Sequence, residues 1–452
     1  MLKYLLATFV LFCSAVVLCA DSPRQPNIIF ILADDLGYGD LGCYGQKQIL
    51  TPNLDQMAKE GLRFTQCYAG STVCAPSRCC LMTGLHTGHA RIRGNARVPL
   101  EPTDATVAEV LKDAGYTTGL CGKWGLGEPE SSGVPNKKGF AYFYGYLNQQ
   151  HAHNYYPDYL WRNQEKVLLP NVVLNGVATK KAVYSPDLIS AEALKFIETN
   201  KEKPFFLYYT PTLPHANNEA KNEGMEIPSD KPYSDKPWPQ PQKNHAAMIT
   251  RLDADVGQLF AKLKELKLDE NTIVFFTSDN GPHREGGGDP TFFNSSGPLR
   301  GIKRAMTEGG IRVPMLVRWP GKIKPGESAF AWAFWDVLPT LAEVGKGKTP
   351  EKLDGQSVWP KILGTGEVKP HEFLYWEFHE NGSKQAVRMG EWKGIRNRLG
   401  GALELYNLAS DLNEKDDVAA KNLEVVAKIE TYLKTARTDS KDWPLQAPKA
   451  KK

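Results

Sequence analysis

The sequence has no strong excess of charge of either sign. Its 452 residues include 55 Lys and Arg against 51 Asp and Glu, which gives a net charge of only +4 at pH 7. Proteins that bind nucleic acid display clustered basic residues, and the one basic tract here is the terminal "APKAKK". We therefore expect no nucleic-acid partner and a solvated basic tail over residues 441–452.

Long hydrophobic runs are also missing, except at the N-terminus. Lys3 precedes an apolar run from Leu5 to Leu18, and Ala20-Asp21 is a plausible cleavage point. This is the pattern of a secretory signal peptide. The run is short for a membrane-spanning helix, and no later segment is long and apolar enough. We expect a signal peptide over residues 1–20, no membrane span, and a secreted or periplasmic protein.

Cysteines are few, since only eight occur in the chain and two of them fall within the expected signal peptide. The six others all lie in the first third of the sequence, at Cys43, Cys67, Cys74, Cys79, Cys80 and Cys121. This is too few for a disulfide scaffold in a chain of this length, although one or two bridges are possible. The group at 74–80 has neither the Cys-x-x-Cys spacing of a redox pair nor the second ligand pair of a zinc site.

Strands alternate with helices along most of the chain. Apolar runs predict strands over 27–35, 117–125, 204–210, 272–281 and 312–320, and helical patterns cover 51–61, 185–200 and 245–266. This order predicts an α/β fold around a mostly parallel sheet, which we assign to a catalytic domain over 21–345. A connection rich in Gly, Pro and Lys follows at 346–370. Short alternating segments and a helix over 419–437 then predict a small antiparallel α+β subdomain at 371–440.

Two of the predicted strands end in acidic or amide residues, Asp34-Asp35 and Asp279-Asn280. Ligands of such sheets bind beyond the carboxyl ends of the strands. One such pair would be explained by a turn or a helix cap, but two pairs at one edge predict a metal site. All four side chains offer hard oxygen atoms, which suit Ca²⁺ or Mg²⁺ and do not suit zinc.

The segment "CAPSRCCLMTG" at 74–84 resembles the signature of the formylglycine-dependent sulfatases, Cys-x-Pro-Ser-Arg followed by Thr-Gly. The resemblance implies an alkaline-phosphatase-like fold and oxidation of Cys74 to formylglycine by a formylglycine-generating enzyme that recognises Pro76, Ser77 and Arg78. One hydroxyl of the hydrated aldehyde would attack sulfur, and the other would expel sulfate. A single Ca²⁺ would polarise the sulfate oxygens and lower the pKa of the attacking hydroxyl.

The same resemblance assigns roles to residues elsewhere in the chain. The expected metal ligands are Asp34, Asp35, Asp279, Asn280 and the modified Cys74. The expected catalytic residues are Cys74, Arg78, Lys123, His215 and Lys303. The lysines would bind sulfate oxygens and His215 the ester oxygen, because cations stabilise the charge that develops in the transition state. The expected substrate is a sulfated carbohydrate.

One position departs from the family pattern. Many sulfatases have Lys-Trp-His-Leu-Gly where this chain has Lys-Trp-Gly-Leu-Gly, with Gly125 in place of the histidine. We expect a histidine from the aromatic-rich segment 144–163 to fill the vacated space and act as the base for sulfate release. His151 and His153 alternate with Ala152, so both would point the same way in an extended loop.

Further substrate-binding residues are expected from two segments. Gln150 and Tyr155 accompany the two histidines in the first, because aromatic and polar groups together suit sugar rings. Glu377, His379 and Gln385 could reach the pocket from the second, "YWEFHENGSKQAVR" at 375–388. Two other functions remain open: hydrolysis of phosphodiesters or phosphonate monoesters on the same scaffold, and a secreted carbohydrate-binding protein that has lost the chemistry.

Overall fold

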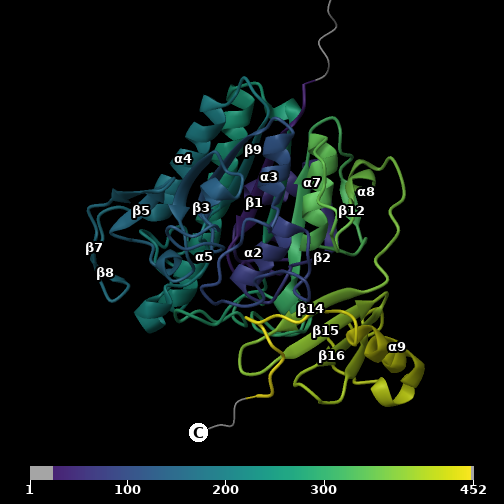
Figure 1. The fold of residues 1–452 in the computed structure, drawn as a ribbon. Helices are drawn as coiled ribbons and strands as arrows, with labels where there is room; N and C mark the ends of the chain where they lie inside the picture. Colours follow the sequence, from purple (N-terminus) through teal and green to yellow (C-terminus); the bar gives the residue numbers. More distant parts are fainter. Residues whose placement is uncertain (1–23, 449–452) are drawn as a thin grey trace, which may run out of the picture.

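The computed structural model describes residues 24–448. The expected signal peptide lies outside the described residues, as do residues 449–452 of the expected tail. The central sheet is built on five parallel strands in the spatial order β10, β1, β9, β3, β4. They span Thr272–Ser278, Asn27–Ala33, Phe205–Thr210, Thr117–Lys123 and Tyr142–Tyr146. Figure 1 labels β1, β9 and β3 at its centre. Both β1 and β10 are buried along their whole length, which explains their continuous apolar sequences.

Antiparallel strands extend this parallel block at both edges. Beside β10 lie β11 (Arg312–Arg318) and then β2 (Leu62–Tyr68), and beside β4 lie β5 (Tyr159–Arg162) and β6 (Glu165–Leu168). The short strands β12 (Gly326–Ser328) and β13 (Trp332–Ala333) pair with β2. A separate hairpin joins β7 (Val172–Leu174) to β8 (Val177–Lys180). The sheet is therefore mixed but mostly parallel, as predicted.

Helices cover both faces of the sheet, each over its own hydrophobic core. One core contains residues of α2 (Cys74–Thr83), α3 (Val107–Asp113), α7 (Val337–Gly345) and α8 (Trp359–Leu363). The other contains residues of α1 (Pro52–Glu60), α4 (Ser185–Thr199) and α5 (Gln240–Glu265). A single turn, α6 (Glu308–Ile311), leads into β11. This layered arrangement confirms the α/β prediction.

A smaller antiparallel sheet follows, at the lower right of Figure 1. It contains β14 (Leu374–Phe378), β15 (Lys384–Met389), β16 (Trp392–Arg396) and β17 (Glu404–Asn407), paired in that order. Helix α9 spans Leu423–Leu433, shorter than the 419–437 expected, and packs Ile429 against this sheet. The small sheet is tied to the large one by the Trp376 indole, which donates to the Ala69 carbonyl at 2.9 Å.

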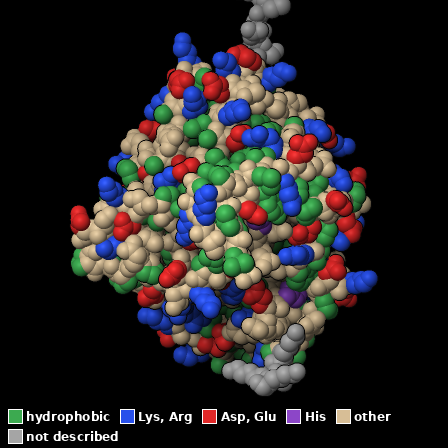
Figure 2. Space-filling model, turned by 90° about the vertical axis from the view of Figure 1, so that its left-hand side faces the viewer, with side chains coloured by type: hydrophobic (Ala, Val, Ile, Leu, Met, Phe, Trp, Pro, Cys, Tyr) green, Lys and Arg blue, Asp and Glu red, His purple; other side chains and the backbone are tan. Residues whose placement is uncertain are grey.

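The state of the cysteines and the mixed charge of the surface are both as the amino-acid composition leads us to expect. All six cysteines of the described part are free, and Cys79 and Cys80 are buried in the core under α2. None of the described helices is long and apolar enough to cross a membrane. The face drawn in Figure 2 carries Lys and Arg side chains interspersed with Asp and Glu side chains.

Candidate active site

The candidate site lies at the carboxyl edge of the parallel block, where four strands end side by side. Ala33, the last residue of β1, pairs with Ser278, the last residue of β10. This register brings Asp34-Asp35 next to Asp279-Asn280. Strand β3 ends on Lys123 itself, and His215 lies in the loop that follows β9. Parallel pairing therefore gathers residues that are far apart in the sequence.

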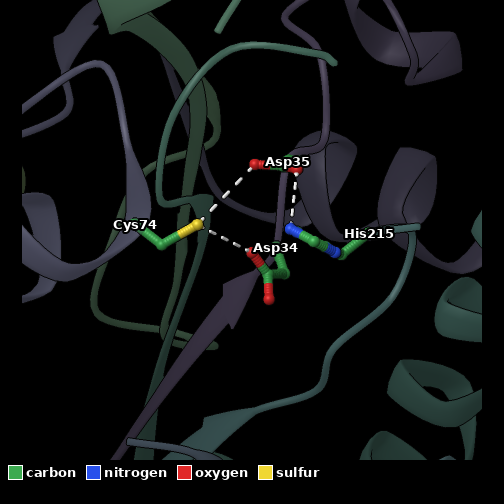
Figure 3. A group of neighbouring side chains, drawn as sticks. All are labelled: Asp34, Asp35, Cys74 and His215. Atoms are coloured by element: carbon green, nitrogen blue, oxygen red, sulfur yellow. Dashed lines mark hydrogen bonds and ion pairs between the residues drawn. The ribbon is translucent and has the colours of Figure 1, made fainter. Parts of the chain in front are cut away.

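Cys74 is the first residue of α2, and its Sγ faces the aspartates (Figure 3). Sγ lies 3.4 Å from Asp34 Oδ1 and 3.9 Å from Asp35 Oδ1. Burial and the negative charges of Asp279 and Asp34 raise the pKa of the Cys74 thiol well above its usual value. The thiol is therefore protonated here, and an unmodified Cys74 would be a poor nucleophile, because the thiolate is the reactive form.

Arg78 lies one helical turn after Cys74 and is fully buried. Its Nε and Nη2 donate to Asp279 Oδ2 at 3.0 and 2.9 Å, and its Nη1 donates to the Lys123 carbonyl at 2.7 Å. Burial and the charge of Asp34 nevertheless raise the pKa of Asp279 to about 7. Arg78 thus joins the helix of Cys74 to the ends of β10 and β3.

Two lysines complete the charge balance of the cluster. Lys123 Nζ donates to Asp34 Oδ2 at 2.7 Å, and Lys303 Nζ donates to Asp35 Oδ2 at 2.8 Å. Lys303 Nζ also lies 3.2 Å from His215 Nε2 and 3.0 Å from Glu285 Oε2. Burial and the charge of Lys303 hold the pKa of His215 well below its usual range.

The tautomer of His215 follows from its two ring contacts. Its Nδ1 lies 2.6 Å from the Ala216 carbonyl, which can only accept a hydrogen bond. Nδ1 therefore carries the proton, and the unprotonated Nε2 accepts from Lys303. Figure 3 shows this ring turned towards Asp35.

The donor set at the strand ends fits a hard cation. Asp34, Asp35, Asp279 and Asn280 are all completely buried. Asn280 Nδ2 donates to Asp35 Oδ1 at 2.7 Å, but Asn280 Oδ1 has no hydrogen-bond partner among residues 24–448. A buried carbonyl oxygen without a partner is costly, and next to three carboxylates it suits a calcium ion, which prefers oxygen ligands.

Cys74, His215 and Lys303 line a cavity of about 350 Å³. Its polar walls include residues from five distant parts of the chain. They are Asn95, Arg97, Gln149, Gln150, His153, Glu219, Arg304 and Glu380. Gln150 accepts a hydrogen bond from Arg97 Nη2 at 2.9 Å. Of the expected substrate-binding residues, Gln150 and His153 line this cavity.

The two histidines of the aromatic-rich segment do not point the same way. Residues 151–153 form a single 3₁₀ turn instead of an extended loop, and two steps of such a turn rotate a side chain by about 240°. His153 stacks on His215 with ring centres 4.9 Å apart, and its Nδ1 lies 3.1 Å from Glu219 Oε2. His151 instead stacks on Tyr159 at 4.3 Å and does not line the cavity.

Comparison with known proteins agrees with this geometry. The family model described as "Sulfatase" matches residues 26–347, and a second, "N-sulphoglucosamine sulphohydrolase, C-terminal", matches 302–439. The chain belongs to the sulfatase family. It is 30% identical to the N-acetylgalactosamine-6-O-sulfatase of Bacteroides thetaiotaomicron, over 92% of this chain and 94% of that protein. It is 35% identical to human arylsulfatase A, over 82% of this chain and 74% of that protein.

A solved structure with a similar sequence has the same fold. The crystal structure of Ps i-CgsB in complex with k-i-k-neocarrahexaose matches with a TM-score of 0.78 and 31% identity, covering 91% of this chain and 93% of that one. The alkaline-phosphatase-like arrangement expected from the sequence is thereby confirmed. With relatives of this similarity, the protein is a sulfuric ester hydrolase.

The space beside Gly125 of this sulfatase is filled by Gln149, a residue without a predicted role. A Cβ atom placed on Gly125 would lie only 2.0 Å from Gln149 Nε2. The expectation that a histidine would fill this space is therefore wrong. Gln149 immediately precedes the predicted Gln150. A glutamine in a polar loop has no distinguishing pattern, however, so the sequence does not single out Gln149.

Four other expected substrate-binding residues, Tyr155, Glu377, His379 and Gln385, do not line the cavity. Tyr155 is fully buried, and its hydroxyl donates to the carbonyls of Thr212 and His215, so it holds the loop that carries His215. Glu377 is fully buried and pairs with Arg93, Arg437 and His379. Neither Glu377 nor His379 lines the cavity, because their carboxylate–imidazole pair is held between the small sheet and the C-terminal segment.

Gln385, the third residue expected from that segment, donates to the Tyr375 hydroxyl at 2.9 Å and is also buried. The segment reaches the cavity through Glu380 instead, which pairs with Arg304 at 2.7 Å.

Proposed function

We propose that this sulfatase hydrolyses the sulfate ester of a carbohydrate, using formylglycine formed from Cys74 and one bound Ca²⁺. The observation that carries the proposal is the setting of Cys74. It is a protonated thiol that faces Asp34 and Asp35 and lines a cavity together with Lys303 and His215. This setting disfavours a thiolate and suits an oxygen nucleophile that a metal can activate.

Five residues would hold the metal, namely Asp34, Asp35, Asp279, Asn280 and the modified Cys74. When present, formylglycine supplies a hydrated aldehyde as nucleophile and a route for sulfate release, and Ca²⁺ acts as a Lewis acid on the sulfate oxygens. Arg78 fixes the position of residue 74 relative to Asp279 through its hydrogen bonds. Its rigid, planar donor geometry suits this positioning role.

Lys123 and Lys303 supply positive charge on the side of the cluster that faces Cys74. Each now donates to one carboxylate, Asp34 or Asp35. Charge that develops on sulfate oxygens in the transition state can be stabilised by Lys303, which lines the cavity, and at longer range by Lys123. Neutral His215 accepts a hydrogen bond from Lys303 at Nε2 and so orients this ammonium group. A substrate bound at Lys303 would bring its ester oxygen close to this pair.

His153 is the proposed proton-transfer group in place of the histidine missing at residue 125. Its Nδ1 is held by Glu219 at 3.1 Å, and the residue lines the same cavity as Cys74. A carboxylate at Nδ1 fixes the tautomer, so Nε2 is the ring nitrogen that can exchange a proton with the substrate. The pairing of His153 with Glu219 makes it the better candidate, since His151 is packed away from the cavity.

A sulfated sugar is the proposed substrate. The relatives include an N-acetylgalactosamine-6-O-sulfatase and a structure in complex with k-i-k-neocarrahexaose. The polar cavity wall, with side-chain amides from Asn95, Asn148 and Gln150, suits sugar hydroxyls. We further propose export to the periplasm or the exterior, maturation by a formylglycine-generating enzyme, and a division into a catalytic domain (21–345) and a C-terminal subdomain (371–440).

The test is a rate comparison on defined esters. The calcium-loaded, matured enzyme is assayed on 4-nitrophenyl sulfate, 4-nitrophenyl phosphate and a panel of sulfated mono- and disaccharides. We expect sulfate release from at least one saccharide, with kcat/KM above that for 4-nitrophenyl sulfate, and no comparable phosphatase rate. A higher kcat/KM for the phosphate ester would contradict the proposal.

A further inference from the structure

The backbone places Gln149 directly over Gly125. The amide of Trp124 donates to the Tyr146 carbonyl at 2.9 Å, and the amide of Gly125 donates to the Leu147 carbonyl at 2.9 Å. The segments after β3 and β4 therefore continue side by side beyond the sheet. Gly125 has a φ of +84°, a backbone conformation that favours glycine.

The side chain of Gln149 then occupies the space that a residue-125 side chain would need. Its Nε2 is 2.0 Å, and its Oε1 3.7 Å, from the position of a Cβ atom at residue 125. Any larger residue at 125 would displace this amide. Both Gly125 and Gln149 line the cavity that also exposes Cys74 and Lys303.

The amide of Gln149 differs from those on either side of it. Asn148 donates to Glu128 Oε2 and accepts from the His151 amide, and Gln150 accepts from Arg97. The Oε1 and Nε2 atoms of Gln149 are both buried, yet neither has a hydrogen-bond partner in the part of the chain that the structure describes. Unpaired buried amide atoms cost free energy, which a ligand in the cavity could recover.

We propose that Gln149 is a substrate-binding residue whose Nε2 donates to an oxygen of the sulfate group, taking the place of the side chain missing at residue 125. This inference rests on the proposed function, in which the cavity receives a sulfate ester. Sulfate oxygens accept hydrogen bonds and carry negative charge, so a neutral donor in the cavity that Lys303 also lines adds binding without a further cation. A glutamine does not titrate, so Gln149 binds the substrate and leaves proton transfer to another group.

The direct test measures sulfate affinity, independently of turnover. Inorganic sulfate is titrated into the calcium-loaded protein by calorimetry, and its inhibition constant is measured with 4-nitrophenyl sulfate as substrate. Gln149→Ala should weaken sulfate binding at least 10-fold, the usual size of a hydrogen bond to a charged group. Gln149→Glu keeps the shape but brings a negative charge, and should weaken it further. Gln56→Ala, which removes an amide bonded to Glu60 on the exposed surface of α1, is the matched control.

A second arm tests the steric coupling. Gly125→Ala should weaken sulfate binding like Gln149→Ala, because the new Cβ displaces the amide. In the Gln149→Ala background the same substitution should have a much smaller effect, so the two changes should be clearly non-additive. Additive effects would overturn the coupling of the two positions.

The outcomes separate this inference from the proposed function. A wild type that hydrolyses sulfate esters, with unchanged sulfate affinity in both folded Gln149 variants, would overturn the inference alone. A wild type that hydrolyses no sulfate ester, but loses sulfate affinity in those variants, would overturn the function and support the inference. If the wild type hydrolyses no sulfate ester and the Gln149 variants keep its sulfate affinity, both the proposed function and the inference would be overturned.

Discussion

Arg78 and Asp279 form a completely buried ion pair in which two guanidinium nitrogens, Nε and Nη2, donate to one carboxylate oxygen at 3.0 and 2.9 Å. The pair crosses from α2 to the end of β10, a separation of 201 residues in the chain. Because Nη1 also binds the Lys123 carbonyl, one side chain connects the residue expected to be modified with two strand ends.

We predict that Arg78→Lys lowers both stability and activity. Lysine keeps the charge but cannot make the three hydrogen bonds, and groups left unpaired in a buried charged network cost about 3 kcal/mol. Urea unfolding should show this loss, together with a large fall in kcat. Arg63→Lys is the control, because its pair with Glu327 is partly exposed and should be worth less than about 1 kcal/mol. A wild-type unfolding curve for Arg78→Lys would contradict the role given to the pair.

Cys74 is predicted to be converted to formylglycine in active enzyme. Trypsin should release Phe64 to Arg78 as one peptide, in which residue 74 carries an aldehyde that reacts with a hydrazide probe. Cys74→Ala should abolish turnover without unfolding the protein, since the side chain it removes is small. An alkylatable thiol at Cys74 in fully active enzyme would disprove the modification.

Calcium is predicted to stabilise the fold through the strand-end oxygens. Ligand binding at 100 times Kd adds about 2.7 kcal/mol to the free energy of unfolding, so calcium should raise Tm in wild type and fail to do so in Asn280→Ala and Asp279→Ala. Because the pKa of Asp279 is raised to about 7, its proton competes with the metal below neutral pH. Calcium affinity should therefore rise from pH 6 to pH 8. Full activity after exhaustive chelation would refute the metal site.

The two histidines of the 3₁₀ turn are predicted to behave differently. His153→Ala should lower kcat by ~10²- to 10⁴-fold, the usual contribution of a general acid or base. If sulfate release is the affected step, intact mass should reveal a sulfated form of residue 74 in this variant. His151→Ala should lower Tm through loss of its stack on Tyr159 and leave kcat near wild type. Equal kcat values for both variants would remove His153 from the mechanism.

Much of the fold and the centre of the candidate site could be predicted, because short stretches of sequence carry the patterns that identify them. Continuous apolar runs mark β1, β9 and β10, and their carboxyl ends locate Asp34, Asp35, Asp279 and Asn280 without any knowledge of tertiary structure. Strand β2 was missed because its sequence, LRFTQCY, mixes polar and apolar residues without a clear period. Helix α2 was also missed, because all ten of its residues are buried and no polar face marks it.

The cavity wall could not be predicted in the same way. Whether Glu377 or Glu380 reaches the cavity depends on how the small sheet docks on the large one, and docking leaves no periodic pattern in the sequence. The directions of the His151 and His153 side chains depend on residues 151–153 forming a 3₁₀ turn. The flanking residues Gln150 and Asn154 carry no sequence signal for such a turn. The position of the Gln149 side chain depends on its contact with Gly125. This contact joins two loops that are brought together only by the pairing of β3 with β4.

A carboxyl group in α5, outside the candidate active site, is predicted to make the stability of the protein depend on pH. Asp255 in α5 is buried, and its Oδ2 has no hydrogen-bond partner in residues 24–448. Burial raises the pKa of Asp255 from 3.8 to about 7, although the nearby Arg251 lowers it. An acid with a raised pKa binds its proton more tightly in the folded state, so its stabilising effect is present at low pH and is lost as the pH rises towards 7.

Asp255→Asn should remove this pH dependence, because the amide is always neutral. At saturating calcium, the free energy of unfolding of the variant relative to wild type should increase between pH 5 and pH 8 by about 2–3 kcal/mol, since each pKa unit is worth about 1.4 kcal/mol. Asp235→Asn, on the exposed surface, is the control and should show no such trend. The measurement is urea unfolding at both pH values. If the free energies of unfolding of wild type and Asp255→Asn change equally between the two pH values, the prediction is wrong. The neighbours of Asp255, Arg251 first among them, would then offset the effect of burial on its carboxyl group in the folded state.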